Sequence, residues 1–346
     1  MKERTMKKRT AAGALIIAMV FLALLAGCGK SSKTGDNKGM ELLNVSYDPT
    51  REFYAKYNEL FSEYWKDKTG EEITVTQSHG GSGSQARSVI EGNEADVVTL
   101  ALAHDVTAIE EAGLIEKGWI EEFDGNSAPY TSTIVFLVRK GNEKGIQDWD
   151  DLVKDGVEVI TPNPKTSGGA CWNFLAAWAY EQKQNGGDEE AAKAFLNKLY
   201  ENVLVLDSGA RGATNTFVEN GQGDVLIAWE NEAYLSMEQY PGEYEIVAPS
   251  ISILAEPSVA VVDSNAKDHG TEELSKAYLE YLYSADAQRL AGENYYRPSD
   301  QEILKEFSDQ FNLDMDLVTI DDFGGWNAAY DTYFNDGAVF DQIYGS

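Results

Sequence analysis

The sequence predicts an α/β fold with mostly parallel sheets, and three features predict it. Short apolar segments alternate from Leu42 onward with longer segments whose apolar residues recur at helical spacing. Two segments, 96–103 and 133–139, are almost continuously apolar, as are strands covered by helices on both faces. Glycine-rich and serine-rich turns separate several of the expected strands from the helices that follow. This alternation is typical of parallel sheets flanked by helices.

The expected elements follow in order along the chain. Apolar and β-branched segments predict strands at 42–47, 73–77, 96–103, 133–139, 157–161, 203–206, 225–229, 244–248 and 258–262. The segment 52–68 carries Phe53, Tyr57 and Phe61 on one helical face and is stopped by Gly70. The same spacing predicts the other helices at 85–90, 106–111, 168–183, 189–200, 213–219, 272–283, 286–293 and 322–334.

The first 27 residues have the pattern of a bacterial signal peptide. Five basic residues within 2–9 precede an apolar segment over 11–25, which is short for a membrane span. The following Leu-Ala-Gly-Cys28 resembles the lipobox of bacterial lipoproteins, in which the cysteine is lipidated and becomes the mature N-terminus. Residues 28–40 then hold the lipidated Cys28 and a polar, flexible tether. We expect an extracytoplasmic protein anchored to the membrane through Cys28, in the periplasm of a Gram-negative cell; a plain secretory signal is the alternative.

Charge and cysteine content exclude several functions. The net charge is −30, and removing residues 1–27 takes away five basic residues and one acidic residue, which leaves −34. Nucleic acid is therefore not an expected partner, because its binding needs a positive surface. With Cys28 lipidated, Cys171 has no disulfide partner. Since salt screens charges beyond about 8 Å, a recessed anion site built from short-range donors remains compatible with this charge.

Three segments have a design suited to an anion. They are 78–83 (SHGGSG), 166–169 (TSGG) and 208–212 (SGARG), and each leads into an expected helix. Glycine lets the backbone approach a ligand closely, and a helix N-terminus offers free N–H groups with partial positive charge. One such segment is usually a plain cap or turn, but three in one exported chain favour an anion site. No Walker motif and no G-x-G-x-x-G in a strand–helix context is present.

The sequence shows no catalytic constellation. Its three histidines, His79, His104 and His269, lie in no zinc motif, and no G-x-S-x-G segment occurs. Cys171 falls inside an expected helix, where a buried small side chain is the ordinary interpretation. Trp229 ends an apolar strand and either packs in the core or donates its indole N–H at a cleft. We expect no catalytic residue, no metal and no cofactor.

These segments, in this order, resemble the sulfate- and thiosulfate-binding proteins of bacterial ABC importers. The similarity runs from Leu42 nearly to Ile343 and rests on LLNVSYDPTR (42–51), QSHGGSG (77–83), EADVVTLALA (94–103), SAPYTSTIVFLVRKGN (127–142), VITPNPKTSGGA (159–170), DSGARGATNTFVE (207–219), GDVLIAWENEA (223–233) and FGGW (323–326). The resemblance implies a two-lobed periplasmic-binding-protein-like fold of type II, with the ligand in the cleft between the lobes and two crossing segments. We expect lobe I to comprise 41–132 and 254–346, and lobe II to comprise 133–253.

The resemblance also implies the ligand contacts. The donors would be the hydroxyl and N–H of Ser82, the hydroxyl of Ser167, the N–H groups of Gly168, Gly169 and Ala210, and the indole of Trp229. Asp48, His79 and Arg211 would contact the peptide units of these loops instead of the ligand. Cys171 stands where members of the family often have arginine, which puts an ion pair at that position in doubt. The implied partners are sulfate and a membrane permease, and the protein is expected to be a monomer.

A donor-only site suits fully ionised sulfate and leaves related ligands as alternatives. Phosphate keeps a proton near neutral pH and would favour a site with an acceptor, for which Asp48 is the candidate. Thiosulfate and molybdate would satisfy the same donors as sulfate. Outside this class, a lipoprotein enzyme or an adhesin is the alternative. Since sulfate keeps its charge from mildly acid to neutral pH, a donor-only site predicts a nearly pH-independent affinity.

Overall fold

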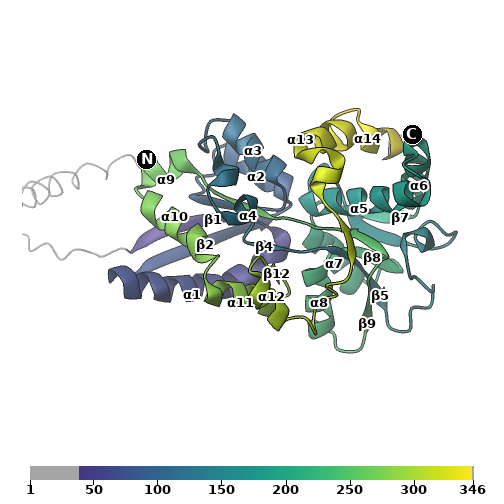
Figure 1. Ribbon diagram of the computed structural model, residues 1–346, viewed down its shortest axis with the longest axis horizontal. Coiled ribbons are helices and arrows are strands. Elements are labelled where there is room, and N and C mark those ends of the chain that lie inside the picture. The colour runs from purple at the N-terminus through teal and green to yellow at the C-terminus, as the bar shows by residue number, and fades with distance from the viewer. Residues whose placement is uncertain (1–38, 345–346) are drawn as a thin grey trace, which may run out of the picture. The chain divides into compact units, whose positions relative to one another are not determined.

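The computed structural model describes residues 39–344, which form two lobes, each built on its own sheet (Figure 1). The signal peptide, Cys28 and nearly all of the tether lie outside the described residues. Within 39–344, no helix combines the length and the apolar character needed to cross a membrane.

The first sheet has four strands in the order β11 (Ser258–Val261), β3 (Val97–Leu100), β1 (Met40–Tyr47) and β2 (Ile73–Gly80). β1 pairs in parallel with β2 and β3, and β11 is antiparallel to β3. Tyr47 lies opposite Gly80, and Ser46 lies opposite Thr99. The carboxyl ends of β1, β2 and β3 therefore meet at one edge, where ligands bind in open α/β sheets.

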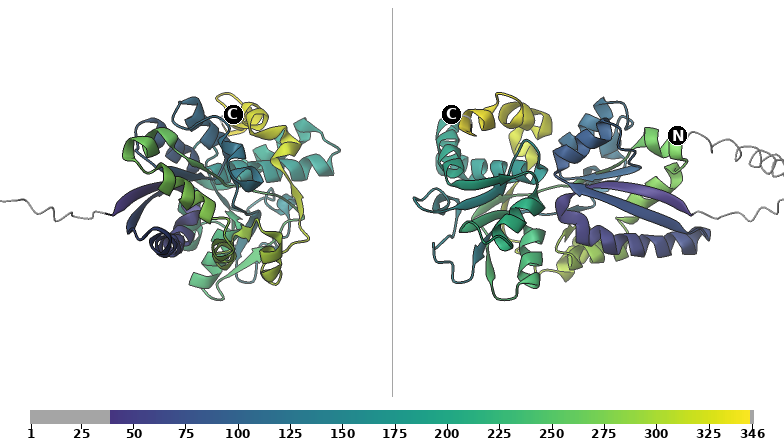
Figure 2. Two further views of the ribbon diagram at one scale, coloured as in Figure 1. Left: turned by 60° about the vertical axis from the view of Figure 1, so that its left-hand side comes forward. Right: turned by 180° about the vertical axis from the view of Figure 1, so that it is seen from behind.

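Helices cover both faces of the first sheet (Figure 2). Val97 packs in the aromatic core with α1 (Arg51–Thr69) and α10 (Glu272–Tyr281), whereas its neighbour Val98 packs with α2 (Ser82–Ile90) and α3 (Ala103–Glu111). This division follows from the alternation of side chains along a strand. It explains why β3 is apolar on both faces.

The second sheet has five strands in the order β7 (Val203–Asp207), β6 (Val159–Pro162), β8 (Val225–Trp229), β5 (Ile134–Arg139) and β9 (Tyr244–Val247). β6 is parallel to β7 and β8, but β5 is antiparallel to β8 and β9. Ile134, the first residue of β5, lies opposite Trp229, the last residue of β8. The chain thus enters this lobe at the carboxyl edge of β8, which forces β5 to run the opposite way. The α/β fold is confirmed, and parallel pairing predominates only in the first sheet.

Four helices flank the second sheet: α5 (Gly168–Gln184), α6 (Glu189–Glu201), α7 (Ala210–Val218) and α8 (Glu230–Gln239). Expected and observed bounds agree within about two residues for most elements. α2, α3 and α7 differ, since all three begin three residues earlier than expected, at Ser82, Ala103 and Ala210. α8 was not expected, nor were α9 (Asp263–His269), α12 (Gln301–Glu306) and α14 (Val339–Tyr344). Other helices within residues 39–344 are α4 (Asp124–Ser127), α11 (Ala285–Glu293), η1 (Asp48–Thr50), η2 (Trp119–Glu121), η3 (Trp149–Asp151) and η4 (Ile320–Phe323).

Short strand pairs lie where the chain passes between the lobes. β4 (Tyr130–Thr131) pairs with β12 (Arg297–Pro298), and β10 (Ile251–Ile253) pairs with β13 (Asp316–Val318). A bridge between Ser132 and Ala255 joins the two crossing segments, and the Thr133 hydroxyl donates to the Ile253 carbonyl at 2.9 Å. The precise lobe boundaries stay a prediction.

The C-terminal residues differ from their expected place in lobe I. α14 lies against α6 of the second lobe, whereas α13 (Gly325–Ala329) and η5 (Tyr330–Phe334) contact both α5 of that lobe and α3 of the first (Figure 1). Aromatic contacts hold them there: Trp326 lies 4.6 Å from Trp172, and Phe334 lies 5.3 Å from Phe174, between ring centroids. β13 therefore forms a third extended segment between the lobes, where two were expected. Burial of these aromatic rings is the physical reason, because they carry large apolar area.

Replacing Phe334 by alanine tests this packing. The ring is 1% exposed, so Phe334→Ala should lower the free energy of unfolding by about 3–5 kcal/mol. Tyr344→Ala is the control, because that ring is 55% exposed and should lose much less. Urea unfolding of both variants measures the difference, and equal stabilities would contradict a packed C-terminal segment.

Candidate functional site

The starts of four helices converge where the two lobes meet. α2, α5, α7 and α8 begin directly after Gly81, Ser167, Gly209 and Trp229, and no side chain caps any of these starts. A helix leaves its first N–H groups without partners inside the helix, and these groups carry partial positive charge. The convergence therefore produces a local field that favours an anion without a cation in contact.

A narrow space with no room for a water molecule lies among these helix starts. Five of the six residues expected to contact a ligand line it: Ser82, Ser167, Gly169, Ala210 and Trp229. The sixth, Gly168, packs beside them, against Ala101, Leu102 and Ser82. Gly80 and Gly81 of the expected segment 78–83 also line it, as do three residues that were not expected: Tyr47, Pro49 and Ala101. The sequence could have indicated these residues only by their position, because they lie at or near the ends of strands.

Trp229 supplies a buried donor that lacks an acceptor. Its side chain is 1% exposed, its ring lies 5.4 Å from the Tyr47 ring, and its indole N–H has no hydrogen-bond partner. A buried donor left unpaired costs about 1–3 kcal/mol. An acceptor placed in this space would remove that cost. The ring is therefore part of the core, and the donation of its N–H to a ligand stays a prediction.

Two glycines permit the close approach of the loops. A Cβ on Gly169 would lie 2.3 Å from the indole nitrogen of Trp229, so a larger residue would displace the indole. A Cβ on Gly81 would lie 2.4 Å from the Thr166 carbonyl oxygen and 2.6 Å from that of Ser208. Gly81 belongs to the first lobe and the two carbonyls to the second. The two lobes are therefore in direct contact around the space.

The Ser82 hydroxyl differs from its expected role. It donates to the Asp105 carboxylate at 2.5 Å and accepts from the Ala101 N–H at 3.0 Å. A hydroxyl has one hydrogen to donate, so this hydroxyl offers none to the space. Sequence reasoning missed Asp105, because nothing in the segment Ala103-His104-Asp105 distinguishes it from the many surface acids of this chain.

Asp48 and His79 lie at the first-lobe side of the site. Asp48 lines the space, and a Cβ on Gly209 would lie 2.2 Å from its carboxylate. Burial raises the pKa of Asp48, while Arg51 and Arg211 oppose that shift. His79 contacts the Tyr47 carbonyl at 3.4 Å and the Gln77 side-chain oxygen at 2.5 Å. Burial lowers the pKa of His79 to about 4, so the ring is neutral at pH 7.

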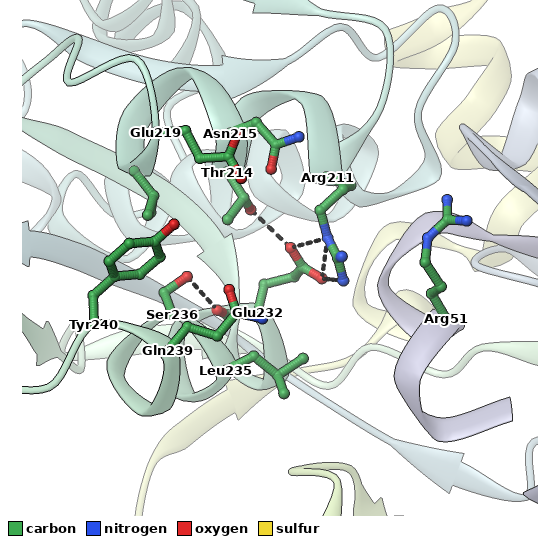
Figure 3. Close-up of a pocket in the computed structure, with 11 residues that line it drawn as sticks. Arg51, Arg211, Thr214, Asn215, Glu219, Glu232, Leu235, Ser236, Gln239 and Tyr240 are labelled. Atoms are coloured by element: carbon green, nitrogen blue, oxygen red, sulfur yellow. Dashed lines mark hydrogen bonds and ion pairs between the residues drawn. The ribbon is translucent and has the colours of Figure 1, made fainter. Parts of the chain in front are cut away.

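Arg211 is held between carboxylates of both lobes. Its guanidinium donates to Glu52 of α1 at 2.7 and 2.9 Å and to Glu232 of α8 at 2.8 Å (Figure 3 shows the Glu232 side). Thr214 also donates to Glu232, at 2.8 Å. Burial would raise the pKa of Glu52, but its hydrogen bonds with Arg211 hold that pKa below its ordinary value. The cation is thus engaged beside the space and ties the two lobes together.

The remaining candidate groups offer no other chemistry at this site. Cys171 is buried, donates to the Pro164 carbonyl at 3.4 Å, and has a pKa raised by burial, so it is a poor nucleophile. Within residues 39–344, no cluster of three or more His, Cys, Asp or Glu side chains is placed to hold a metal ion.

Comparisons with known proteins find similar sequences and a similar structure. The family model described as "Bacterial extracellular solute-binding protein" matches residues 50–297. The sulfate-binding protein of Escherichia coli (strain K12) is 60% identical over 308 residues, which cover 88% of this chain and 93% of that protein. The thiosulfate-binding protein of Pseudomonas aeruginosa PAO1 is 48% identical, over 94% of this chain and 98% of that protein. The solved structure of the sulfate-binding protein SubI from Mycobacterium tuberculosis H37Rv matches with a TM-score of 0.77 at 32% identity, covering 86% of this chain and all of that one.

A methyl group on Gly169 should disrupt the site. Gly169→Ala should weaken ligand binding at least about tenfold, because its Cβ would push the Trp229 indole out of place. Gly83→Ala is a matched control, since its Cβ would meet other atoms only at 3.6–3.7 Å, an ordinary contact. Calorimetric titration with sulfate measures both, and equal affinities of the two variants would contradict the importance of this contact.

Proposed function

The chain belongs to the bacterial extracellular solute-binding protein family, and we propose that it captures sulfate outside the cytoplasm and delivers it to the membrane permease of an ABC importer. The observation that carries the proposal is the unpaired indole N–H of Trp229 among four uncapped helix starts. The relatives named as sulfate-binding proteins support the choice of ligand.

The donors suit a tetrahedral dianion. We propose that sulfate accepts hydrogen bonds from the N–H groups of Ser82, Gly168, Gly169 and Ala210, the hydroxyl of Ser167 and the indole of Trp229. Sulfate carries acceptors only, so every one of these donors would find a partner. The net charge of −30 opposes anions at long range, but screening limits that effect to about 8 Å at physiological salt.

Related anions differ in what they need from the site. Phosphate retains a proton near neutral pH, and a buried proton without an acceptor would be penalised. Among the residues lining the space, Asp48 carries the one carboxylate. Phosphate would be excluded only if Asp48 does not accept its proton. Thiosulfate is the second candidate ligand, because a relative of 48% identity is named a thiosulfate-binding protein.

Binding and delivery need no chemical step. We propose that the chain acts without enzymatic activity, as a monomer, and that the permease receives the ligand from it. The contacts of Arg211 support the absence of a catalytic role for this residue, since its guanidinium donates to Glu52 and Glu232. His79, whose pKa burial lowers to about 4, is a weak base at most and contacts the Tyr47 carbonyl at the end of β1.

Removing the Trp229 donor tests the proposal. Trp229→Phe keeps an aromatic ring but deletes one hydrogen bond to a charged acceptor, so sulfate affinity should fall by about 10- to 150-fold, or roughly 1.5–3 kcal/mol. Calorimetry with sulfate, thiosulfate and phosphate as ligands measures this loss. Trp178→Phe is the matched control: its indole N–H is also buried and unpaired, but the ring packs against Tyr333, on a face of α5 away from the space. Effective phosphate binding by the wild type, or no loss in Trp229→Phe, would overturn the proposal.

We also propose that the chain is processed at Cys28 and anchored by lipid on that cysteine. Cys28→Ser should leave the precursor unprocessed or release the protein from the membrane, because no thiol remains to carry the lipid. Fractionation of cells and metabolic labelling with a fatty acid measure this. Sulfate binding should survive, since Cys28 is not among the residues proposed to contact the ligand. Normal processing with unchanged membrane association would refute the anchor.

A further inference from the structure

A second indole joins the two lobes beside the space among the helix starts. Trp172 lies one turn into α5 of the second lobe, and its indole N–H donates to the Ala101 carbonyl at 3.0 Å. Ala101 directly follows β3 of the first lobe and lines the space. Both residues are 0% exposed. This buried hydrogen bond therefore crosses from one lobe to the other where the candidate donors meet.

Ala101 connects this hydrogen bond to the candidate donor of the first lobe. Its N–H donates to the Ser82 hydroxyl oxygen at 3.0 Å, and Ser82 is the first residue of α2. On the opposite side, Gly168 is the first residue of α5, and a Cβ on it would lie 2.8 Å from the Ala101 Cβ. The contacts from Ser82 through Ala101 to Trp172 thus fix the start of α2 relative to the start of α5.

The C-terminal part of the chain supports the Trp172 ring. Trp326 of α13 meets this ring edge to face, with the centroids 4.6 Å apart and the ring planes at 78°. Aromatic pairs in this geometry are stabilising beyond the area that they bury. Trp326 therefore restricts the orientations open to Trp172 and keeps the indole N–H directed at Ala101.

We propose that Trp172 is a positioning residue of the ligand site, whose hydrogen bond to Ala101 holds the lobes together over the bound anion and slows its release. Trp172 is not among the residues that line the space, so it acts through Ala101 and not by touching the ligand. The inference rests on the proposed function, since it concerns the release of the ligand from the same site.

The hydrogen bond favours the arrangement in which the lobes are together. In that arrangement the Ala101 carbonyl is shielded from water, so removal of the indole donor would leave it unpaired. When the lobes part, water can reach this carbonyl and take the place of the indole. Loss of the indole donor therefore destabilises the closed arrangement more than the open one. Release of the ligand should become faster, while association, which precedes closure, should change little.

Trp172→Phe removes the donor and keeps an aromatic ring. The protein is loaded with radioactive sulfate and diluted into unlabelled sulfate, and release is followed by rapid filtration, while calorimetry gives the affinity. Release should be about 5- to 30-fold faster than from the wild type, and the affinity should fall by a similar factor. If the wild type binds no sulfate, the proposed function fails and this inference with it. If Trp172→Phe binds sulfate and releases it at the wild-type rate, this inference alone fails.

Trp149→Phe is the matched control for a purely structural effect. Trp149 is also 0% exposed, and its indole donates to the Ile251 carbonyl at 2.8 Å, but neither residue lines the space. Urea unfolding should show a loss of stability in both variants, whereas Trp149→Phe should release sulfate as slowly as the wild type. Equally accelerated release from Trp149→Phe and Trp172→Phe would indicate a general loss of stability and overturn the proposal.

Trp326→Leu tests the support of the Trp172 ring. This variant should also release sulfate faster than the wild type, but less so than Trp172→Phe, because the indole donor is still present. The double variant should release sulfate about as fast as Trp172→Phe alone, since both substitutions act through one hydrogen bond. An acceleration equal to the product of the two single effects would contradict this assignment.

Discussion

A buried N–H group must find an acceptor or carry a penalty of roughly 1–3 kcal/mol, and this requirement organises the junction of the two lobes. The Trp229 indole is unpaired there, and the starts of α2, α5, α7 and α8 have no side-chain caps. Parallel strands bring these donors to the sheet edges, and glycines let the loops touch. The donors come from both lobes, so an anion satisfies all of them only when the lobes are together.

Among the described residues that line the ligand space, Asp48 is the one charged residue and no cation is present. Arg211, which follows the candidate donor Ala210 in the chain, is engaged by Glu52 and Glu232 and so contributes to holding the lobes together. Asp48 and Asp105 bring negative charge close to the same space, at its lining and behind Ser82. A dianion in this space would therefore depend on dipoles and hydrogen bonds, which act over short distances and are little weakened by salt.

The sequence predicted the α/β fold, most elements and five residues of the lining, because apolar periodicity and glycine-rich helix starts are local signals. Three features could not be predicted. The place of α13 and η5 beside α5 depends on which apolar surface Trp326 and Phe334 meet, and that surface lies far away in the sequence. β5 reverses direction because of where the chain enters the lobe. The hydrogen bond that Ser82 gives to Asp105 is a tertiary contact of a residue whose type is common on the surface.

The third segment between the lobes separates the ends of the described chain. β1, the first strand, belongs to the first lobe, while α14, the last helix, packs on the second. Any hinge motion that parts the lobes must therefore change the distance between the two ends. A pair of fluorophores at the ends would report opening and closing without a label near the ligand, and a tag on α14 would move with the second lobe while β1 moved with the first.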